Sequence, residues 1–414
     1  MAEGQSKFHY RVNIAIFTNN YLPNPYGVST SIETFRREFE KLGHKVYIFA
    51  PKFPGFSDEN PNVFRYPAID FEIKIKFPLA IPYSRKISKI LSGLDIDIIH
   101  AQHPNLLGTA ARKWAKKKKV PLIFTWHTLY DQYTDFVPFL PAKFSAGYMI
   151  KKSVKFTEDS DAVVIPTDSI APILKNWGVH PVKSPQSGDA EGVFNRVKKE
   201  IYVVPTGVSE EEFQNADRNL IRKKYSISDN DILLLLITRL TAEKNVEFVF
   251  RSVMEILKER KNVKFLVSGD GYLRPSLEKY CEQNGISEQV IFSGIVSRDE
   301  IKNYYAAADI FVYGSKSETQ GMILTEAMYM GLPIVAVCAT GVISLVQNNK
   351  NGFLTCVTGE KEFAYMITKL ILDKKLREKT GEESARIARE NFTASVCAKK
   401  MLVVYEKAIE NHSK

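Results

Sequence analysis

Two almost entirely apolar segments constrain the fold of this chain more than any other feature. They are Val12–Thr18 (VNIAIFT) and Ile232–Thr238 (ILLLLIT). A run without polar alternation is typical of a strand covered on both faces, as in parallel sheets. Each run precedes a segment of helical periodicity, so we expect helices over Ser29–Leu42 and from about Val246. The chain therefore contains two similar α/β units in series.

The alternation of strand and helix continues after each run, which favours parallel sheets covered by helices. Further expected strands are His44–Ala50, Ile96–His100, Leu122–Trp126, Ala162–Ile165, Val263–Ser268, Val290–Phe292, Ile310–Tyr313, Pro333–Val337 and Gly352–Thr355, with first-unit helices near 105–118 and 168–177. Val179–Lys199 interrupts the pattern with prolines and glycines and is expected to be a flexible surface excursion. We predict two Rossmann-like domains, residues 11–205 and 206–392, with a helix over 393–411 that packs back on the first.

The uneven distribution of charge along the chain indicates what kind of partner the first half meets. Residues 1–207 carry 28 Lys and Arg against 19 Asp and Glu, a net charge of +9, which leaves 29 against 28, or +1, for the rest. No nucleic-acid motif accompanies the basic half, so an anionic lipid surface is the preferred partner.

The four cysteines form no CxxC pair and are expected to be buried free thiols. Because the N-terminus lacks an apolar signal core, we expect a cytoplasmic protein.

Charged side chains follow two strands of the second unit, at the edge where open sheets bind ligands. Arg239 and Lys244 stand in TRLTAEKN, and Glu318 and Glu326 bracket Gly321 in SKSETQGMILTEA. Fixed positive charge and the free amides of a helix start, here Met322 to Leu324, suit a departing diphosphate. Taken alone, Arg239 and Lys244 would be interpreted as solvated surface charges, and it is the SKSETQGMILTEA stretch that favours a ligand site.

These motifs, with VSGDGYL and NGFL, resemble the retaining GT-B glycosyltransferases of the glycogen-synthase-like family four, over essentially the whole chain. The resemblance implies two Rossmann-like domains that face a nucleotide-sugar across a cleft. The residues expected to be catalytic are His127, Arg239, Lys244 and Glu318. In the family, the two cations grip the diphosphate, Glu318 accepts hydroxyls of the donor sugar, Glu326 holds the ribose diol and His127 faces the sugar.

The resemblance also assigns the remaining donor contacts. They are Gly27, Gly269, Gly271, Ile295, Val296, Gln320, Gly321, Met322, Ile323 and Leu324. It implies that no protein nucleophile is used, because the acceptor hydroxyl attacks on the leaving-group face and the phosphate takes its proton. No Asp-x-Asp cluster is present beside the motif, so no metal or other cofactor is expected. The chain departs from the family at Ser344, where a Glu is expected. His100 and His103 are either structural or line the acceptor site.

The acceptor is indicated by three stretches of the basic half. Phe77–Leu91 is a basic amphipathic piece, and Trp114 precedes a run of lysines; such segments suit a lipid interface. The candidate membrane contacts are Arg85, Lys86, Lys89, Trp114, Lys116, Lys117, Lys118 and Lys119. HTLYDQYTDFVPF, from His127, is similar to glucosyltransferases that act on diacylglycerol. We therefore expect transfer of glucose from UDP-glucose to a membrane lipid on the inner face of the cell membrane. The alternatives are a soluble sugar, glycan or inositol-phosphate acceptor, a GDP-sugar donor, or a protein without catalysis.

Overall fold

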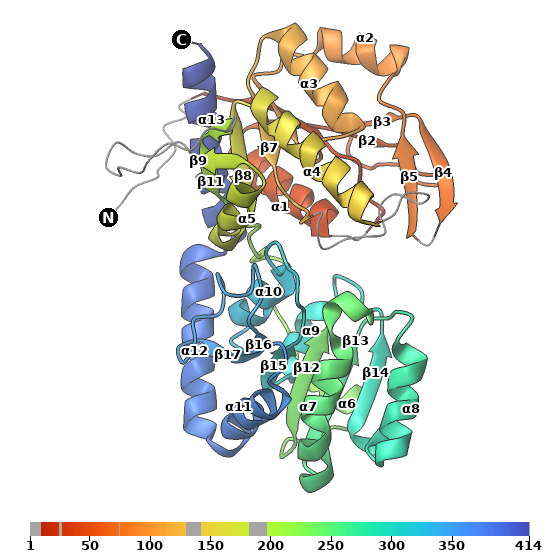
Figure 1. Ribbon diagram of the computed structural model, residues 1–414, viewed down its shortest axis with the longest axis vertical. Helices are drawn as coiled ribbons and strands as arrows, with labels where there is room; N and C mark the ends of the chain where they lie inside the picture. Colours follow the sequence, from red (N-terminus) through yellow and green to blue (C-terminus); the bar gives the residue numbers. More distant parts are fainter. Residues whose placement is uncertain (1–9, 25–26, 74, 130–141, 182–196, 414) are drawn as a thin grey trace. The chain divides into compact units, whose positions relative to one another are not determined.

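The computed structural model describes residues 10–24, 27–73, 75–129, 142–181 and 197–413. The chain divides into two compact units (Figure 1). One comprises the chain up to Gly207 together with everything from Ala394 onward, and the other is Val208–Thr393. The C-terminal helix therefore belongs to the first unit, although the whole second unit lies between that helix and the rest of the first unit in the sequence.

The first unit is built on a seven-stranded parallel sheet in the order β11–β8–β7–β6–β1–β2–β3. Its strands are β1 (Asn13–Phe17), β2 (Lys45–Pro51), β3 (Val63–Tyr66), β6 (Ile98–Ala101), β7 (Leu122–Thr125), β8 (Ala162–Ile165) and β11 (Ile201–Val203). The strands predicted within the first unit are confirmed, whereas β3 and β11 were not expected. Both are short: β3 contains Arg65, and β11 spans only three residues, so neither has the long apolar run that marks the predicted strands.

Helices cover both faces of this sheet. Alternate residues of β1 enter separate cores, with Ile14 and Ile16 on one side and Ala15 and Phe17 on the other. The first core is completed by α1 (Gly27–Lys41) and α13 (Ala394–His412), which pack together. The second core takes side chains from α2 (Arg85–Gly93), α3 (Leu107–Lys118), α4 (Ala142–Asp159), η1 (Asp168–Ile170) and α5 (Ala171–Asn176).

Two irregular segments of the first unit differ from expectation. β4 (Ala68–Ile73) and β5 (Ile75–Ala80) form an antiparallel hairpin, so the expected amphipathic piece over Phe77–Leu91 begins as a strand. Its helical part, α2, starts only after Ser84, whose hydroxyl accepts the Ile87 amide as an N-cap. The expected excursion begins and ends in a short parallel pair, β9 (Val179–Pro181) and β10 (Val197–Lys199); residues 182–196 lie outside the described residues.

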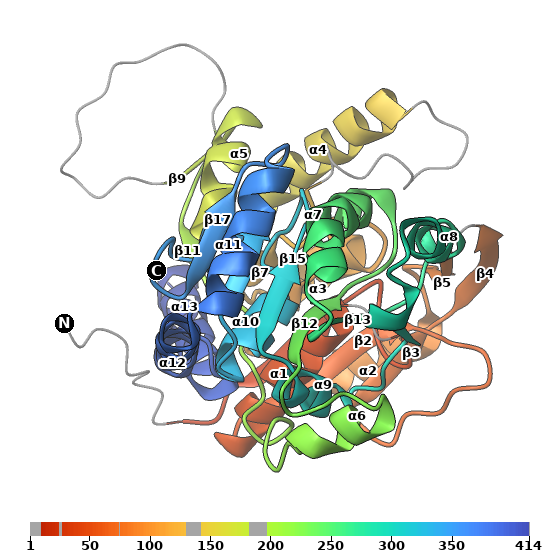
Figure 2. The ribbon, with the colours of Figure 1, turned by 90° about the horizontal axis from the view of Figure 1, so that it is seen from below.

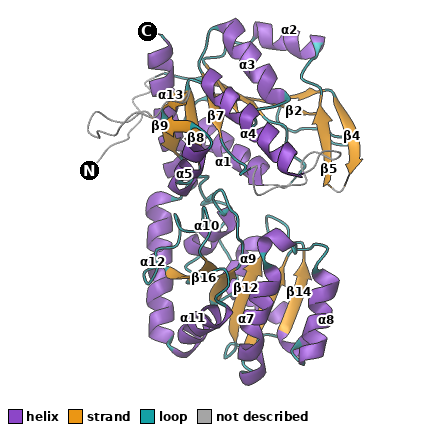
Figure 3. Cartoon of the chain, viewed as in Figure 1, coloured by secondary structure: helices purple, strands orange, loops and turns teal. Residues whose placement is uncertain are grey.

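The second unit has a six-stranded parallel sheet in the order β14–β13–β12–β15–β16–β17 (Figures 2 and 3). Its strands are β12 (Ile232–Ile237), β13 (Val263–Ser268), β14 (Val290–Gly294), β15 (Ile310–Tyr313), β16 (Ile334–Val337) and β17 (Gly352–Thr355), all confirming the prediction. Its helices are α6 (Arg218–Lys224), η2 (Ala242–Lys244), α7 (Val246–Glu259), α8 (Arg274–Asn284), η3 (Ser287–Gln289), α9 (Ile301–Ala307), α10 (Met322–Tyr329), α11 (Glu360–Leu372) and α12 (Lys374–Asn391). Because all the strands are parallel, their carboxyl ends meet at one edge, and the loops there carry most of the predicted donor-site residues.

The cysteines correct the expectation that all four thiols are buried. Cys281 and Cys397 are buried, but Cys338 and Cys356 are exposed. The exposed pair stands one residue beyond the ends of β16 and β17, where the strands leave the core. The strands themselves are buried, but the cysteine side chains that follow them are accessible to solvent.

Candidate functional site

An ion pair joins two of the residues that the sequence placed at the donor site. Lys244 ends η2, just after β12, and Glu318 lies in the loop between β15 and α10. The Lys244 Nζ is 2.5 Å from the Glu318 Oε1, with only 11% and 13% of the side chains exposed. The Tyr313 hydroxyl donates to the same carboxylate oxygen. Burial alone would raise the pKa of Glu318, but Lys244 and Tyr313 outweigh it and hold the pKa below its usual value.

Arg239 is placed differently from Lys244, although both follow β12. Its side chain is 48% exposed and lies 3.2 Å from the Glu243 carboxylate, a pair that is worth little at such exposure. The structure thus places one cation against a buried carboxylate and leaves the other accessible on the same loop. An exposed guanidinium can turn toward an anion that arrives from solvent, and its fork matches phosphate oxygens.

A second buried carboxylate, Glu326 on α10, is held by two groups that the sequence analysis did not single out. The Tyr305 hydroxyl donates to its Oε2 at 2.9 Å, and Arg298 donates to its Oε1. Arg298 also donates to Glu212, at 2.8 Å. Arg298 follows β14 and so stands at the same carboxyl edge as the other loops, which is the signal that could have found it. Each carboxylate oxygen can accept a second hydrogen bond, so Glu326 retains capacity for hydroxyls.

The loop that precedes α10 depends on two glycines. Gly321 caps the helix with φ of 79°, and a β-carbon on Gly341 would lie 2.6 Å from the Glu318 carbonyl oxygen. Both positions therefore exclude a side chain. The expectation of a free amide at Leu324 is wrong, because that N–H donates to the Gly321 carbonyl at 2.8 Å. Met322 and Ile323 are half-buried, and Gln320 is buried.

Two further predicted donor glycines, Gly269 and Gly271, pack against the protein's own backbone. A β-carbon on Gly269 would lie 1.9 Å from the Thr238 carbonyl oxygen, and one on Gly271 would lie 2.3 Å from that of Leu240. The turn after β13 therefore packs directly against the loop that carries Arg239, and backbone hydrogen bonds between Leu240 and both Asp270 and Leu273 join the two. Ile295 follows β14 at the same edge with 82% of its surface exposed, and Val296 is half-buried.

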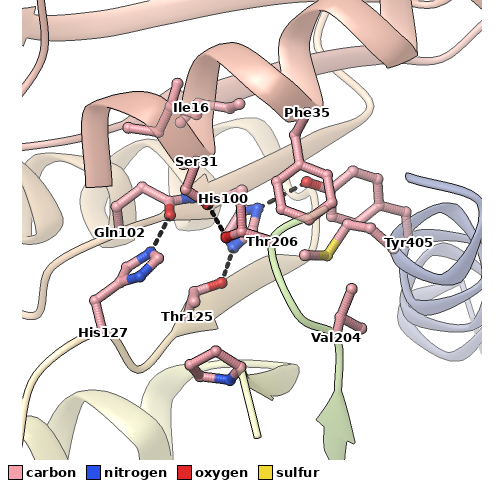
Figure 4. Close-up of a pocket in the computed structure, with 13 residues that line it drawn as sticks. Ile16, Ser31, Phe35, His100, Gln102, Thr125, His127, Val204, Thr206 and Tyr405 are labelled. Carbon is pink, nitrogen blue, oxygen red and sulfur yellow. Dashed lines mark hydrogen bonds between the residues drawn. The ribbon is translucent and has the colours of Figure 1, made fainter. Parts of the chain in front are cut away.

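In the first unit, His127 and His100 line a small cavity near the carboxyl ends of β6 and β7 (Figure 4). The His127 Nε2 donates to Gln102 at 2.6 Å. His100 is hydrogen-bonded to Thr125 and to Tyr405 of α13, at 2.6 and 2.7 Å. Burial lowers the pKa of both histidines to about 3, with neighbouring histidines adding to the effect on His127. Both are therefore neutral near pH 7 and can form hydrogen bonds but cannot supply positive charge.

The neighbouring predictions in the first unit have different outcomes. His103 accepts the backbone N–H of Asn19 at 3.1 Å, and burial lowers its pKa to about 4. His100 ties the sheet to α13, which favours the structural role for that residue. Gly27 is exposed and begins α1. Of the stretch that begins at His127, residues 130–139 lie outside the described residues.

The basic candidates for membrane contact separate into two groups. Arg85, Lys86 and Lys89 are all exposed on α2. In the lysine run, Lys118 donates to the Leu94 carbonyl at 2.6 Å, while Lys116, Lys117 and Lys119 are exposed. The expectation that Trp114 meets a membrane is wrong, because its ring packs in the core and is 6% exposed. None of the helices within the described ranges has the length and apolar character needed to cross a bilayer.

The geometry agrees with comparisons to known proteins. A family model described as "Glycosyl transferases group 1" matches residues 217–386, and one described as "Glycosyltransferase Family 4" matches residues 25–184. A Streptococcus pneumoniae protein named alpha-monoglucosyldiacylglycerol synthase is 31% identical, covering 92% of this chain and 83% of the relative. One of the same name from Acholeplasma laidlawii is 26% identical, covering 97% and 99%.

Solved structures share the architecture. Anabaena Alr3699/HepE, in complex with UDP and glucose, has a TM-score of 0.71 at 16% identity and covers 96% of this chain and 100% of its own. Sucrose-phosphate synthase from Thermosynechococcus elongatus has a TM-score of 0.74 at 16% identity, covering 97% and 100%. At this identity the likeness concerns the fold, and the family follows from the sequence matches. The chain therefore belongs to glycosyltransferase family 4: it has the GT-B fold and is a retaining hexosyltransferase.

Proposed function

We propose that this enzyme transfers glucose from UDP-glucose to a hydroxyl of a membrane lipid such as diacylglycerol. The observation that carries the proposal is the pair of relatives named alpha-monoglucosyldiacylglycerol synthase, which align with 92% and 97% of the chain. A second candidate is a mannosyltransferase. A Corynebacterium glutamicum relative named GDP-mannose-dependent alpha-mannosyltransferase is 24% identical over 87% of the chain, which makes GDP-mannose the alternative donor.

The edge of the second sheet supplies the groups that this reaction needs. The departing UDP gains negative charge, which Arg239 and Lys244 would stabilise, and fixed charges need no reorganisation at the moment of reaction. The ionised Glu318 would accept hydroxyls of the glucose, since its contact with Lys244 holds it in place. Glu326 would accept the ribose hydroxyls. The acceptor hydroxyl would attack from the leaving-group face and pass its proton to the departing phosphate, with no metal required.

The first unit presents a surface suited to a lipid bilayer, formed by the β4–β5 hairpin and α2. Ile69 and Leu79 are opposite one another across the hairpin and are 50% and 37% exposed. Pro78 and Ala80, on either side of Leu79, are buried, as the alternation of a strand requires. Ile81 and Tyr83 continue the exposed apolar surface toward α2. We call these four exposed residues the hairpin patch.

The hairpin patch is followed directly by positive charge. Arg85, Lys86 and Lys89 are exposed on the helix that begins two residues after Tyr83. Apolar side chains that can enter the acyl boundary, next to cations that meet anionic headgroups, are the combination that holds a protein at a lipid interface. We infer that the first unit contacts an anionic membrane through this surface, where a lipid acceptor is available.

A donor and acceptor panel tests the proposed reaction. UDP-glucose, UDP-galactose and GDP-mannose would each be supplied with diacylglycerol in vesicles, with empty vesicles, or with soluble sugars, and nucleotide release would be measured. We expect release from UDP-glucose that rises at least about tenfold with diacylglycerol, because water is a poor acceptor in a site that binds the lipid hydroxyl. The product would be checked for an α-linkage and the reaction repeated with EDTA. Release that responds only to GDP-mannose or to soluble sugars would refute the proposal.

Charge reversal on α2 tests the membrane surface. Replacing Arg85, Lys86 and Lys89 by Glu should weaken binding to vesicles containing phosphatidylglycerol by about 100-fold or more, at roughly 1 kcal/mol per cation. The matched control reverses Lys116, Lys117 and Lys119, which are also exposed, and should bind nearly as the native protein does. Sedimentation with vesicles at low and high salt measures both, since salt screens exposed charges. A larger loss in the control would assign the membrane contact to α3 instead.

A further inference from the structure

The two exposed cysteines of the second unit stand opposite one another on neighbouring parallel strands. β16 and β17 pair in register up to Val337 and Thr355, and the Cys338 N–H then donates to the Thr355 carbonyl at 2.8 Å. In a parallel ladder this bond places Cys338 beside the residue that follows Thr355, which is Cys356. Residues paired in a ladder project to the same face of the sheet, and both thiols are exposed because they lie one residue past the ends of buried strands.

Strand spacing brings this pair within reach of a disulfide. Neighbouring strands lie about 4.8 Å apart, and disulfides join residues whose Cα atoms are about 4.4–6.8 Å apart. The other two cysteines differ from this pair. Cys281 and Cys397 are buried, and burial raises the pKa of each thiol to about 12. Of the four thiols, those of Cys338 and Cys356 are therefore the ones that can react with reagents from solvent.

The segment that begins at Cys338 rests on the proposed donor site. Thr340 forms a bridge with Ser317, and a β-carbon on Gly341 would lie 2.6 Å from the Glu318 carbonyl oxygen. This segment therefore packs directly against the backbone of Glu318, with no space between them for a side chain. A displacement at Cys338 has to be transmitted to Glu318 or absorbed within two residues.

We propose that Cys338 and Cys356 form a redox-active dithiol that lowers donor use when it is oxidised. The oxidant is a small-molecule disulfide. The thiolate of one cysteine attacks it and releases one thiol as a mixed disulfide forms; the second cysteine thiolate then displaces the other thiol. Two cysteine thiols and one external disulfide thus become one internal disulfide and two external thiols. The effect on turnover rests on the proposed role of Glu318, whereas the dithiol itself does not.

Closure of the disulfide changes the local geometry in a defined direction. It draws the two β-carbons to about 3.8 Å, closer than the strand spacing of about 4.8 Å. A shift of this order in the segment up to Gly341 would move Glu318, and a misplacement of about 1 Å at a catalytic group can cost roughly 100-fold in rate. We expect oxidation to lower kcat/KM for the sugar nucleotide at least about tenfold, reversibly.

The test combines chemistry and kinetics on the full-length enzyme. Before oxidation, Ellman's reagent should titrate two thiols rapidly and the other two only after denaturation. Glutathione disulfide should then produce an internal Cys338–Cys356 disulfide, identified by peptide mass, and dithiothreitol should reverse it. Cys338→Ser and Cys356→Ser should each keep the reduced enzyme's activity and lose its sensitivity to oxidation, whereas Cys281→Ser should remain sensitive.

The outcomes separate the dithiol from the proposed reaction. If glutathione remains attached to each cysteine and no internal disulfide forms, the dithiol inference is overturned. If the disulfide forms while kcat/KM and UDP affinity stay unchanged, its coupling to the donor site is overturned. Calorimetric binding of UDP in both redox states provides a readout that does not depend on the acceptor. A reduced enzyme that ignores diacylglycerol but binds UDP redox-sensitively would refute the proposed acceptor and support this inference.

Discussion

Replacing Lys244 by methionine is expected to lower kcat by about 100- to 1000-fold, the loss seen when one fixed group that stabilises transition-state charge is removed. Stability should fall as well. The Lys244 ammonium lies 2.5 Å from Glu318 Oε1 in a setting where both side chains are nearly buried. Its removal leaves the carboxylate without its cation, which costs about 3 kcal/mol of unfolding free energy. Steady-state kinetics and denaturant unfolding of the variant would measure the two losses.

A second substitution separates these two effects. In the double variant Lys244→Met with Glu318→Gln the uncompensated charge is absent, so the free energy of unfolding should recover by about 2 kcal/mol. Activity should stay low, because neither the cation nor the carboxylate is restored. Lys258→Met is a matched control, since Lys258 is on the same unit in an exposed pair with Glu255 and should change neither quantity appreciably. A Lys244 variant with normal kcat would remove Lys244 from the catalytic groups.

The pH dependence of the same pair has a definite sign. The pKa of Glu318 is held below its usual value in the folded protein, so the stabilisation is present above the unfolded pKa and is lost as pH falls through the folded one. The contribution of the pair therefore disappears only in acid, below about pH 4.3.

The fold was predictable from the sequence to the extent that its strands are buried on both faces. Ile232–Ile237 is a continuous apolar run, and Val263–Ser268 is apolar apart from Lys264 and its last residue; the predicted bounds of both strands are correct to within a residue. The β4–β5 hairpin was missed because its strands mix charged and apolar residues, and apolar side chains such as Ile69 and Leu79 are exposed. Amphipathic spacing over Phe77–Leu91 then suggested one continuous element where a strand, a turn and a helix occur.

The candidate site was predictable only as residue types at one edge of a sheet. Lys244 and Glu318 were singled out by their motifs, but 74 residues separate them, and only the fold shows that they form an ion pair. Arg298 and Tyr305 were missed because neither belongs to a motif; they matter through Glu326, which they hold from two sides. Trp114 was misassigned because an aromatic residue before four lysines has the same sequence pattern in a core as at a lipid interface.

Glu326 and Glu212 offer a matched comparison, because both carboxylates pair with Arg298. Glu326→Gln and Glu212→Gln each remove one negative charge from this cation and keep a hydrogen-bonding side chain of the same size. Similar stability losses, of about 1–3 kcal/mol, are expected from the two changes. Their effects on catalysis should differ. If Glu326 accepts the ribose hydroxyls, Glu326→Gln should lower kcat/KM for the sugar nucleotide by about 100-fold, the equivalent of about 2.7 kcal/mol for a charged acceptor.

Glu212→Gln should keep kcat/KM within about threefold of the native value. Glu212 shares the Arg298 contact with Glu326 but is not proposed to contact the ribose. Measuring KM for the donor, UDP affinity by calorimetry and unfolding by denaturant in all three proteins distinguishes a ligand contact from a purely structural one. A structural role for Glu326 predicts that the two variants lose activity in proportion to their stability. A ligand role predicts equal loss of stability with unequal loss of UDP affinity, because the ribose belongs to UDP and its diol would meet only the Glu326 carboxylate.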